Sequence, residues 1–197
     1  MGKKQWITKL MDRDRQAFTA LSKTGHCSKD QLNTFIKDGR IKNMVKDGYL
    51  QKVTFSPKTG DKMEAYKLTA KGRDLCTREW GVRGHYIAQS LPHDLALANK
   101  YFSLTEAQRD TWKTESQLRA ELENKLEQYR IGQDNRYYQY QEQLQEHKIS
   151  VPDCTYVTST GTEIAYEVIT NSYGQAEIQA KIEYVQIMEL KMETERV

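Results

Sequence analysis

Apolar and polar positions near the N-terminus predict two short helices joined by a tight turn. Ser28 and Gln31 form a capping box, which marks the start of the first helix. Apolar residues then follow at helical spacing: Leu32, Phe35 and Ile36. After Asp38, a favourable N-cap residue, a second apolar stripe begins, and Gly48 stands where a helix would end in a left-handed residue.

The second of these helices has one apolar and one polar face. Its apolar stripe is made of three residues: Ile41, Met44 and Val45. Its other face carries three cations and one amide: Arg40, Lys42, Asn43 and Lys46. Lysine and arginine neutralise phosphates, while arginine can pair with guanine and asparagine with adenine in the major groove. We therefore expect a DNA recognition helix, with Arg40 and Asn43 reading bases and Lys42 and Lys46 contacting phosphates.

A two-stranded hairpin is predicted directly after this helix. Residues 49–55 and 64–69 alternate apolar and polar side chains, and the segment between them is polar and basic. Residues 6–23 are predicted to form a further helix that packs behind the other two. This is the pattern of a winged helix-turn-helix domain, in which we expect three more lysines to contact DNA: Lys29, Lys58 and Lys62.

The middle of the chain is predicted to be helical. One helix follows the wing and is broken by Gly81 and Gly84, and another covers residues 90–104. A third, residues 114–129, has a helical pattern that continues towards residue 144 and carries a narrow stripe: Leu118, Leu122 and Leu126. Either a second copy, in a coiled-coil-like homodimer, or its own domain must cover this stripe, and the short run of heptads leaves both options open.

The last segment changes from helical to strand-forming residues. Residues 149–159 and 162–172 read as two strands, and the remaining residues, from 174 onwards, read as a helix. The sequence therefore predicts an α+β chain in three parts. These are a winged-helix DNA-binding domain (1–84), a helical connecting region (85–148) and a strand-strand-helix region (149–197).

The charges divide the chain into a basic and an acidic part. The 197 residues have a formal net charge of +3. Residues 1–85 hold 19 Lys and Arg against 9 Asp and Glu (+10), and residues 86–197 hold 11 against 18 (−7). The first part suits a polyanion, and the second suits protein contacts. Three dispersed cysteines, with no signal peptide or membrane-length apolar run, predict a cytoplasmic protein without membrane contact.

Several short segments resemble one protein family. They are YKLTAKGRDL (66–75), HDLALANKYFSL (93–104), WKTESQLR (112–119), VPD (151–153) and YEV (166–168). Together they look like the replication-relaxation proteins of plasmids and other mobile elements of Gram-positive bacteria, and the resemblance spans most of the chain. It implies DNA binding in plasmid replication, relaxation or conjugative transfer. It also implies a C-terminal region related to PD-(D/E)XK nucleases.

The resemblance allows the nuclease pattern to be placed residue by residue. Asp153 matches the first acidic position and Glu167 the second, and two such carboxylates could hold Mg²⁺. The third position should be lysine but is Ile169, and no cation follows before Lys181. The predicted elements also end with a helix where the full nuclease fold continues with another strand. The sequence thus favours a structural remnant of the nuclease fold that is used for assembly. We expect no cofactor, and Mg²⁺ only if the nuclease-like region is active.

The leading hypothesis is a non-enzymatic, sequence-specific protein that binds double-stranded DNA at an origin or transfer site of a mobile element. It would recruit replication or conjugation proteins through its acidic part. One alternative is a dimeric winged-helix transcriptional regulator with the leucine stripe as its seam. The other is a Mg²⁺-dependent nuclease that uses Asp153 and Glu167.

Overall fold

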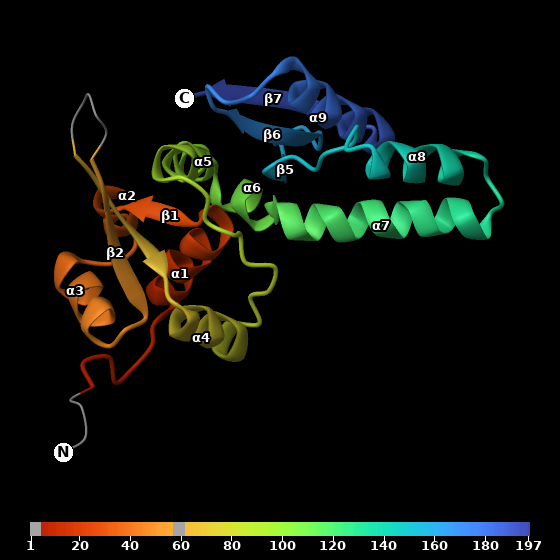
Figure 1. Cartoon of the computed structure of the whole chain (residues 1–197). Coiled ribbons are helices and arrows are strands. Elements are labelled where there is room, and N and C mark those ends of the chain that lie inside the picture. The colour runs from red at the N-terminus through yellow and green to blue at the C-terminus, as the bar shows by residue number, and fades with distance from the viewer. Residues whose placement is uncertain (1–4, 57–61) are drawn as a thin grey trace. The chain divides into compact units, whose positions relative to one another are not determined.

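The computed structural model of the protein describes residues 5–56 and 62–197. The chain forms two compact units, Met1–Ser103 and Leu104–Val197, which we call the N-terminal and C-terminal units (Figure 1). Within the described residues there are nine helices and two sheets, so the expected mixture of helices and strands is confirmed. In the same residues no helix combines the length and the apolar character that crossing a membrane requires.

The N-terminal unit has the element order of a winged helix. In chain order the elements are α1 (Asp12–Thr24), β1 (His26–Ser28), α2 (Lys29–Asn33), α3 (Asp38–Lys46), β2 (Leu50–Phe55), β3 (Met63–Leu68), α4 (Ala70–Trp80) and α5 (Leu91–Ser103). The strands pair antiparallel in the order β1-β3-β2 (Figure 1). Helices α2 and α3 form the helix-turn-helix, and β2 and β3 form the wing.

Local sequence signals account for the helix-turn-helix. The capping box is present, because Ser28 Oγ accepts a hydrogen bond from the amide of Gln31 and Gln31 Oε1 accepts one from the amide of Ser28. Ile41 and Met44 are buried, and Gly48 has a φ of 76° just beyond the end of α3. The sequence predicted Asp38 as the N-cap of this helix. In the structure Asp38 is the first residue of α3, and Lys37 is its N-cap.

Helix α5 belongs to the N-terminal unit. It packs on α1 and β1, and its buried Asp94 lies 2.7 Å (Oδ2) from Nδ1 of His26, a residue of β1. The unit therefore ends at Ser103, whereas the sequence analysis placed this helix in a connecting region that begins at residue 85. A contact between residues this far apart in the chain cannot be predicted from a local sequence pattern.

Gly72 in α4 is expected to be intolerant of a side chain. A Cβ at this position would lie 2.3 Å from the carbonyl oxygen of Tyr49. Although alanine favours a helix by about 1 kcal/mol, relieving a clash with backbone costs more, so Gly72→Ala should destabilise by about 1–3 kcal/mol. A Cβ added to Gly39 in α3 would meet nothing within 4 Å, and Gly39→Ala should stabilise by roughly 0.5–1 kcal/mol. Thermal denaturation measures the stability of both variants against the parent protein. If Gly72→Ala and Gly39→Ala shift the melting temperature in the same direction, the prediction is wrong.

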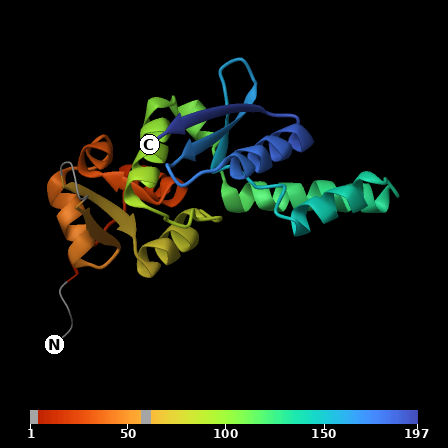
Figure 2. The ribbon, with the colours of Figure 1, turned by 45° about the horizontal axis from the view of Figure 1, so that its top comes forward.

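The C-terminal unit is built on a mixed four-stranded sheet. Its elements are α6 (Glu106–Asp110), β4 (Lys113–Thr114), α7 (Glu115–Ile131), α8 (Arg136–Gln145), β5 (Cys154–Val157), β6 (Glu163–Ile169), α9 (Gln175–Met188) and β7 (Lys191–Arg196). The strand order is β4-β5-β6-β7, with β5 antiparallel to β6 and β7 parallel to β6. Helix α9 makes the crossover that a parallel pair requires, as Figure 2 shows.

The helix predicted from residue 174 onwards ends earlier than expected. Glu189 has a φ of 58°, α9 stops at Met188, and the chain returns as β7. Residues 191–196 contain few strand-forming side chains, but their backbone pairs with β6, and Tyr156 donates a hydrogen bond to Glu193. The prediction of a terminal strand-strand-helix was therefore wrong, and the region is strand-strand-helix-strand.

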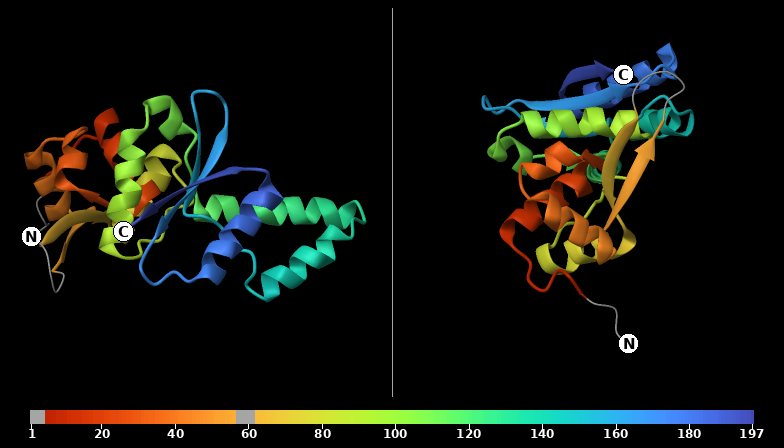
Figure 3. Two further views of the ribbon diagram at one scale, coloured as in Figure 1. Left: turned by 90° about the horizontal axis from the view of Figure 1, so that it is seen from above. Right: turned by 90° about the vertical axis from the view of Figure 1, so that its left-hand side faces the viewer.

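The long helical pattern after residue 114 is also divided. α7 ends at Ile131, Gln133 takes a φ of 53°, and α8 begins at Arg136. The two helices lie side by side as a hairpin in Figures 1 and 3, and the rings of Tyr129 and Tyr140 are 6.0 Å apart. Tyr129 and Tyr140 thus pack between the two helices, whereas Tyr138 is 74% exposed.

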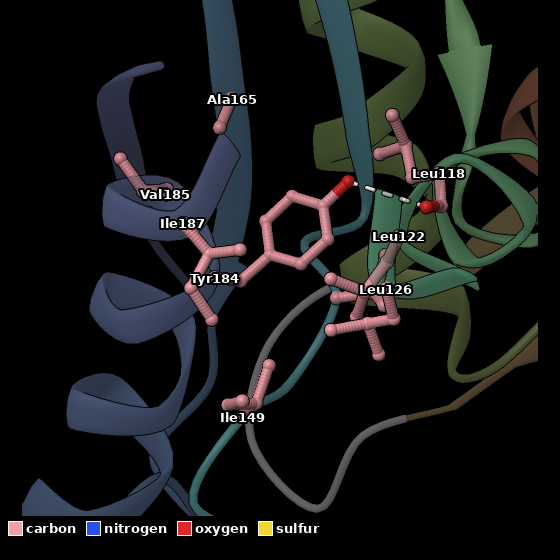
Figure 4. Packing of buried hydrophobic residues seen from close by; sticks show 9 residues of the cluster. Leu118, Leu122, Leu126, Ile149, Ala165, Tyr184, Val185 and Ile187 are labelled. Atoms are coloured by element: carbon pink, nitrogen blue, oxygen red, sulfur yellow. Dashed lines mark hydrogen bonds between the residues drawn. The ribbon is translucent and has the colours of Figure 1, made fainter. Parts of the chain in front are cut away.

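The leucine stripe of α7 is covered by its own unit. Leu118, Leu122 and Leu126 are buried in a cluster with residues of α9 and the sheet. Figure 4 shows the ring of Tyr184, from α9, extended towards these leucines, with its hydroxyl donating to the carbonyl oxygen of Leu118 at 3.3 Å. The stripe is therefore not available as the seam of a homodimer, which corrects that expectation.

Candidate nucleic-acid interface

Helix α3 presents a polar face to solvent. Lys42 and Lys46 are exposed and Asn43 is half-buried, whereas Ile41 and Met44 on the opposite face are buried in the unit. Apolar burial thus sets the rotation of the helix and leaves two ammonium groups and one amide outward. These are positions at which the sequence predicts base and phosphate contacts, and that DNA-binding role stays a prediction.

Arg40 is not part of that open face. Its Nε and Nη2 atoms donate to the two carboxylate oxygens of Asp14, each at 2.5 Å, and Nη2 also donates to the carbonyl oxygen of Lys9. The side chain of Asp14 is fully buried in α1. A bidentate pair of this kind holds α3 against α1. The expected base-reading role of Arg40 is therefore replaced by a structural one.

The other cations expected at the interface differ in their surroundings. Lys29 pairs with Asp38 at 2.6 Å, and this hydrogen bond raises the pKa of Lys29 and lowers that of Asp38. Lys62 lies 3.6 Å from Glu64, which also pairs with Lys52. These exposed pairs can exchange partners with phosphates at little cost in free energy. Lys58 lies outside the described residues.

The segment before α1 is attached to the end of α3. The amides of Trp6 and Ile7 donate to the carboxylate of Asp47 at 2.6–3.0 Å. The ammonium of Lys46 lies 4.2 Å from the centre of the Trp6 ring, a cation–π contact. Lys46 is thus oriented by an aromatic side chain, and sequence reasoning did not detect this because the two residues are far apart in the chain.

Lys37 is a further cation of this region and was not among the residues predicted from the sequence. It is exposed and occupies the N-cap of α3, where helix amides and a lysine together favour a phosphate. The signal available in the sequence was a lysine directly before a helix start.

The acidic residues singled out in the sequence meet in the C-terminal unit. The amide of Asp153 donates to Glu167 Oε2, and the amide of Val168 donates to Asp153 Oδ2, both at 2.9 Å. Lys181 of α9 places its ammonium 2.9 Å from Glu167 Oε1. Burial and the nearby Asp153 carboxylate raise the pKa of Glu167, against the opposing effect of Lys181. Ile169 is buried, and its aliphatic side chain supplies no charge.

A cavity of about 540 Å³ adjoins this cluster. Tyr173 and Lys181 line it, and both bind the same oxygen of Glu167, with Tyr173 donating at 2.7 Å. Lys181 was the residue that sequence reasoning missed in this role. Lys181 is buried on α9 next to Ala180 and near Tyr184, and only the structure shows this burial.

A second buried polar cluster lies in the N-terminal unit. Asp94 Oδ2 and Oδ1 lie 2.7 Å and 3.1 Å from the Nδ1 atoms of His26 and His93. The amide of Gln89 also donates to Asp94. Within residues 5–56 and 62–197 no group of three or more His, Cys, Asp or Glu could hold a metal ion. The contact between Asp94 and His26 joins α5 to β1.

The topology of the N-terminal unit and the polar face of α3 define a winged-helix protein with a second, mixed α/β unit. No family model matches the chain, and no curated protein matches it. Among solved structures it is similar to PadR of Bacillus subtilis in complex with operator DNA, at 14% sequence identity and a TM-score of 0.28. That likeness covers 92% of this chain and 97% of PadR.

Proposed function

We propose that the protein binds double-stranded DNA in a sequence-specific manner through its N-terminal unit. The observation that carries this proposal is the outward face of α3, where Lys42, Asn43 and Lys46 lie side by side next to a wing. Asn43 is assigned to base reading and the lysines to phosphates, together with Lys29, Lys37 and Lys62 around them. Lys58 keeps its place as a further phosphate contact predicted from the sequence.

The charge distribution supports this assignment. Counted over the two structural units, Met1–Ser103 has 20 Lys and Arg against 10 Asp and Glu, and Leu104–Val197 has 10 against 17. The formal charges are therefore +10 and −7. Because a polyanion repels the second unit, DNA binding belongs to the first.

Salt dependence of DNA affinity tests the placement of α3. Lys42→Ala and Lys46→Ala should each weaken binding to all sequences about equally and lower the slope of log K against log salt by about one. Fluorescence anisotropy with labelled duplexes at several salt concentrations measures both quantities. Lys148→Ala, which removes an exposed lysine of the C-terminal unit, is the matched control and should leave the slope unchanged. If all three variants behave alike, α3 does not face DNA.

We assign the biological setting from the resemblance to replication-relaxation proteins. The protein would mark an origin or transfer site of a mobile element, and its acidic unit would contact replication or conjugation proteins. Retention of fragments from its own replicon provides the test. Recovery of origin or transfer-site fragments supports the assignment, whereas recovery of promoter fragments would show a transcriptional regulator instead.

A further inference from the structure

The N-terminal unit contains a cavity of about 520 Å³ that is lined by elements other than the proposed recognition helix. Its wall is formed by the end of α1, the end of β3, the beginning of α4 and the segment 85–88 that leads towards α5. The volume is in the range of about 300–1,000 Å³ that is usual for small-molecule sites. Apolar side chains from three of these elements line it: Leu21, Leu68, Tyr86 and Ile87.

Hydrogen bonds fix the segment that forms one side of this cavity. The amide of Tyr86 donates to the carbonyl oxygen of Ser22, in α1, at 2.8 Å. The ring of His85 lies between two hydroxyls, with Nδ1 2.7 Å from Ser22 Oγ and Nε2 3.2 Å from Thr77 Oγ1. Because both ring nitrogens have a partner, His85 ties the segment to α1 and to α4 at the same time.

Two lining residues carry a positive charge, Lys67 of β3 and Arg73 of α4. The guanidinium of Arg73 donates to the carbonyl oxygen of Leu68 at 3.2 Å. Within residues 5–56 and 62–197 neither cation pairs with a carboxylate, and no aspartate or glutamate of these residues lines the cavity. By contrast, Lys52 of the same hairpin pairs with Glu64 at 2.7 Å. The cavity therefore combines an apolar wall with two uncompensated positive charges.

The positive charge acts on the cavity wall itself. Burial and the nearby charge of Arg73 lower the pKa of His85; Asp74 opposes this effect and Lys23 adds to it. A lowered pKa favours the neutral imidazole near neutral pH, so His85 contributes hydrogen bonds rather than a third charge. Asp74 is the neighbouring carboxylate, and it lies outside the lining.

We propose that this cavity binds a small organic anion that has an apolar aromatic or aliphatic body. Lys67 and Arg73 would hold the anionic head group, because a guanidinium matches the two oxygens of a carboxylate and an ammonium adds a point charge. The apolar side chains would contact the body of the ligand. Ile87 is 83% exposed, so a ligand in the cavity would remove apolar surface from water. This binding is independent of the DNA contact proposed for α3.

The test uses the fluorescent anion anilinonaphthalene sulfonate with the full chain. The parent protein should bind it saturably, and naphthoate, a carboxylate of similar shape, should displace it. Phenylnaphthylamine has the same aromatic body without the sulfonate and should bind at least about tenfold more weakly. Lys67→Gln and Arg73→Gln should each weaken sulfonate binding by about tenfold, the usual effect of losing one hydrogen bond to a charged group. Neither variant should change the affinity for phenylnaphthylamine.

Two further variants serve as matched controls. Arg78→Gln removes a cation from the same helix, but Arg78 pairs with Glu79 and does not line the cavity. Arg119→Gln removes a cation that lines the cavity of the C-terminal unit. Both variants should bind anilinonaphthalene sulfonate as the parent does. If Arg119→Gln weakens binding and Arg73→Gln does not, the anion occupies the C-terminal unit and the proposal is wrong.

The same variants distinguish this site from an extension of the DNA interface. If Lys67→Gln and Arg73→Gln each lower the salt dependence of DNA affinity by about one and leave sulfonate binding unchanged, the two cations serve DNA and the proposal is overturned. Equal affinity of the parent for the sulfonate and for neutral phenylnaphthylamine would overturn it as well. That comparison needs no substitution, so it decides the question even if circular dichroism shows that a variant is unfolded.

Discussion

Replacing Asp14 with alanine is expected to destabilise the N-terminal unit by about 3–5 kcal/mol, because it leaves a largely buried guanidinium without its partner. Asp14 is fully buried and accepts two hydrogen bonds from Arg40 at 2.5 Å. It also accepts one from the amide of Met11, which caps the start of α1. All three bonds are lost together in Asp14→Ala.

Asp12→Ala provides the matched control for this variant. Asp12 is also in the first turn of α1 and pairs with Arg15 at 2.8 Å, but both side chains are more than half exposed. An exposed pair contributes about 0–1 kcal/mol, so Asp12→Ala should change stability little. Hydrogen exchange of α1 and α3 peptides in the full chain gives the unit's free energy of opening. Equal losses for the two variants would show that the Asp14–Arg40 pair does not hold α3.

The consequence for DNA binding follows from the same contact. Because Arg40 is the first cation of α3 and is held by α1, loss of Asp14 frees the N-terminal end of the recognition helix. Asp14→Ala should therefore weaken specific binding even under conditions where the chain remains folded.

Replacing Leu122 with alanine should destabilise the C-terminal unit by about 2–5 kcal/mol. Leu122 is 3% exposed and belongs to the core cluster between α7 and α9 (Figure 4). The loss of stability has two physical sources. The removed methyl groups no longer contribute the free energy of burying apolar atoms, and an empty cavity remains in the core. Hydrogen exchange of the β5 and β6 peptides measures it.

Ile131→Ala is the control on the same helix. Ile131 ends α7 and is 72% exposed, so its truncation should change stability by less than about 0.5 kcal/mol. The two variants also test whether the leucine stripe is a dimer seam. If it were, Leu122→Ala would mainly lower the mass of the protein in solution from that of a dimer to that of a monomer. Analytical ultracentrifugation should show the same mass for the parent, Leu122→Ala and Ile131→Ala. A fall in mass confined to Leu122→Ala, with its unit still stable, would restore the seam.

Local signals predicted the N-terminal unit well. The capping box at Ser28, the apolar stripe through Ile41 and Met44, and the left-handed Gly48 each act over a few residues, and each is present. Such signals are readable because helix starts, helix ends and buried faces depend on neighbouring side chains and backbone amides.

Local signals were weakest at the C-terminal end, where the strand β7 was not predicted. Residues 191–196 contain few strand-forming side chains, and β7 forms through backbone pairing with β6. Lys181 lies 14 residues from Glu167 in sequence, and the rotation of α9 on the sheet brings its ammonium to the carboxylate. In both cases tertiary context overrides local propensity.

The sequence by itself determined the helix-turn-helix, the wing, the division into a basic and an acidic part, and the presence of Asp153 and Glu167 as a spaced acidic pair. The tertiary structure alone decided which cations remain available to a ligand. It committed Arg40 to Asp14, enclosed the leucines of α7 in their own core, and brought Lys181 to the acidic pair. The physical reason is range: helix caps and amphipathic stripes form between near neighbours in the chain, whereas ion pairs and core contacts depend on where separate elements meet.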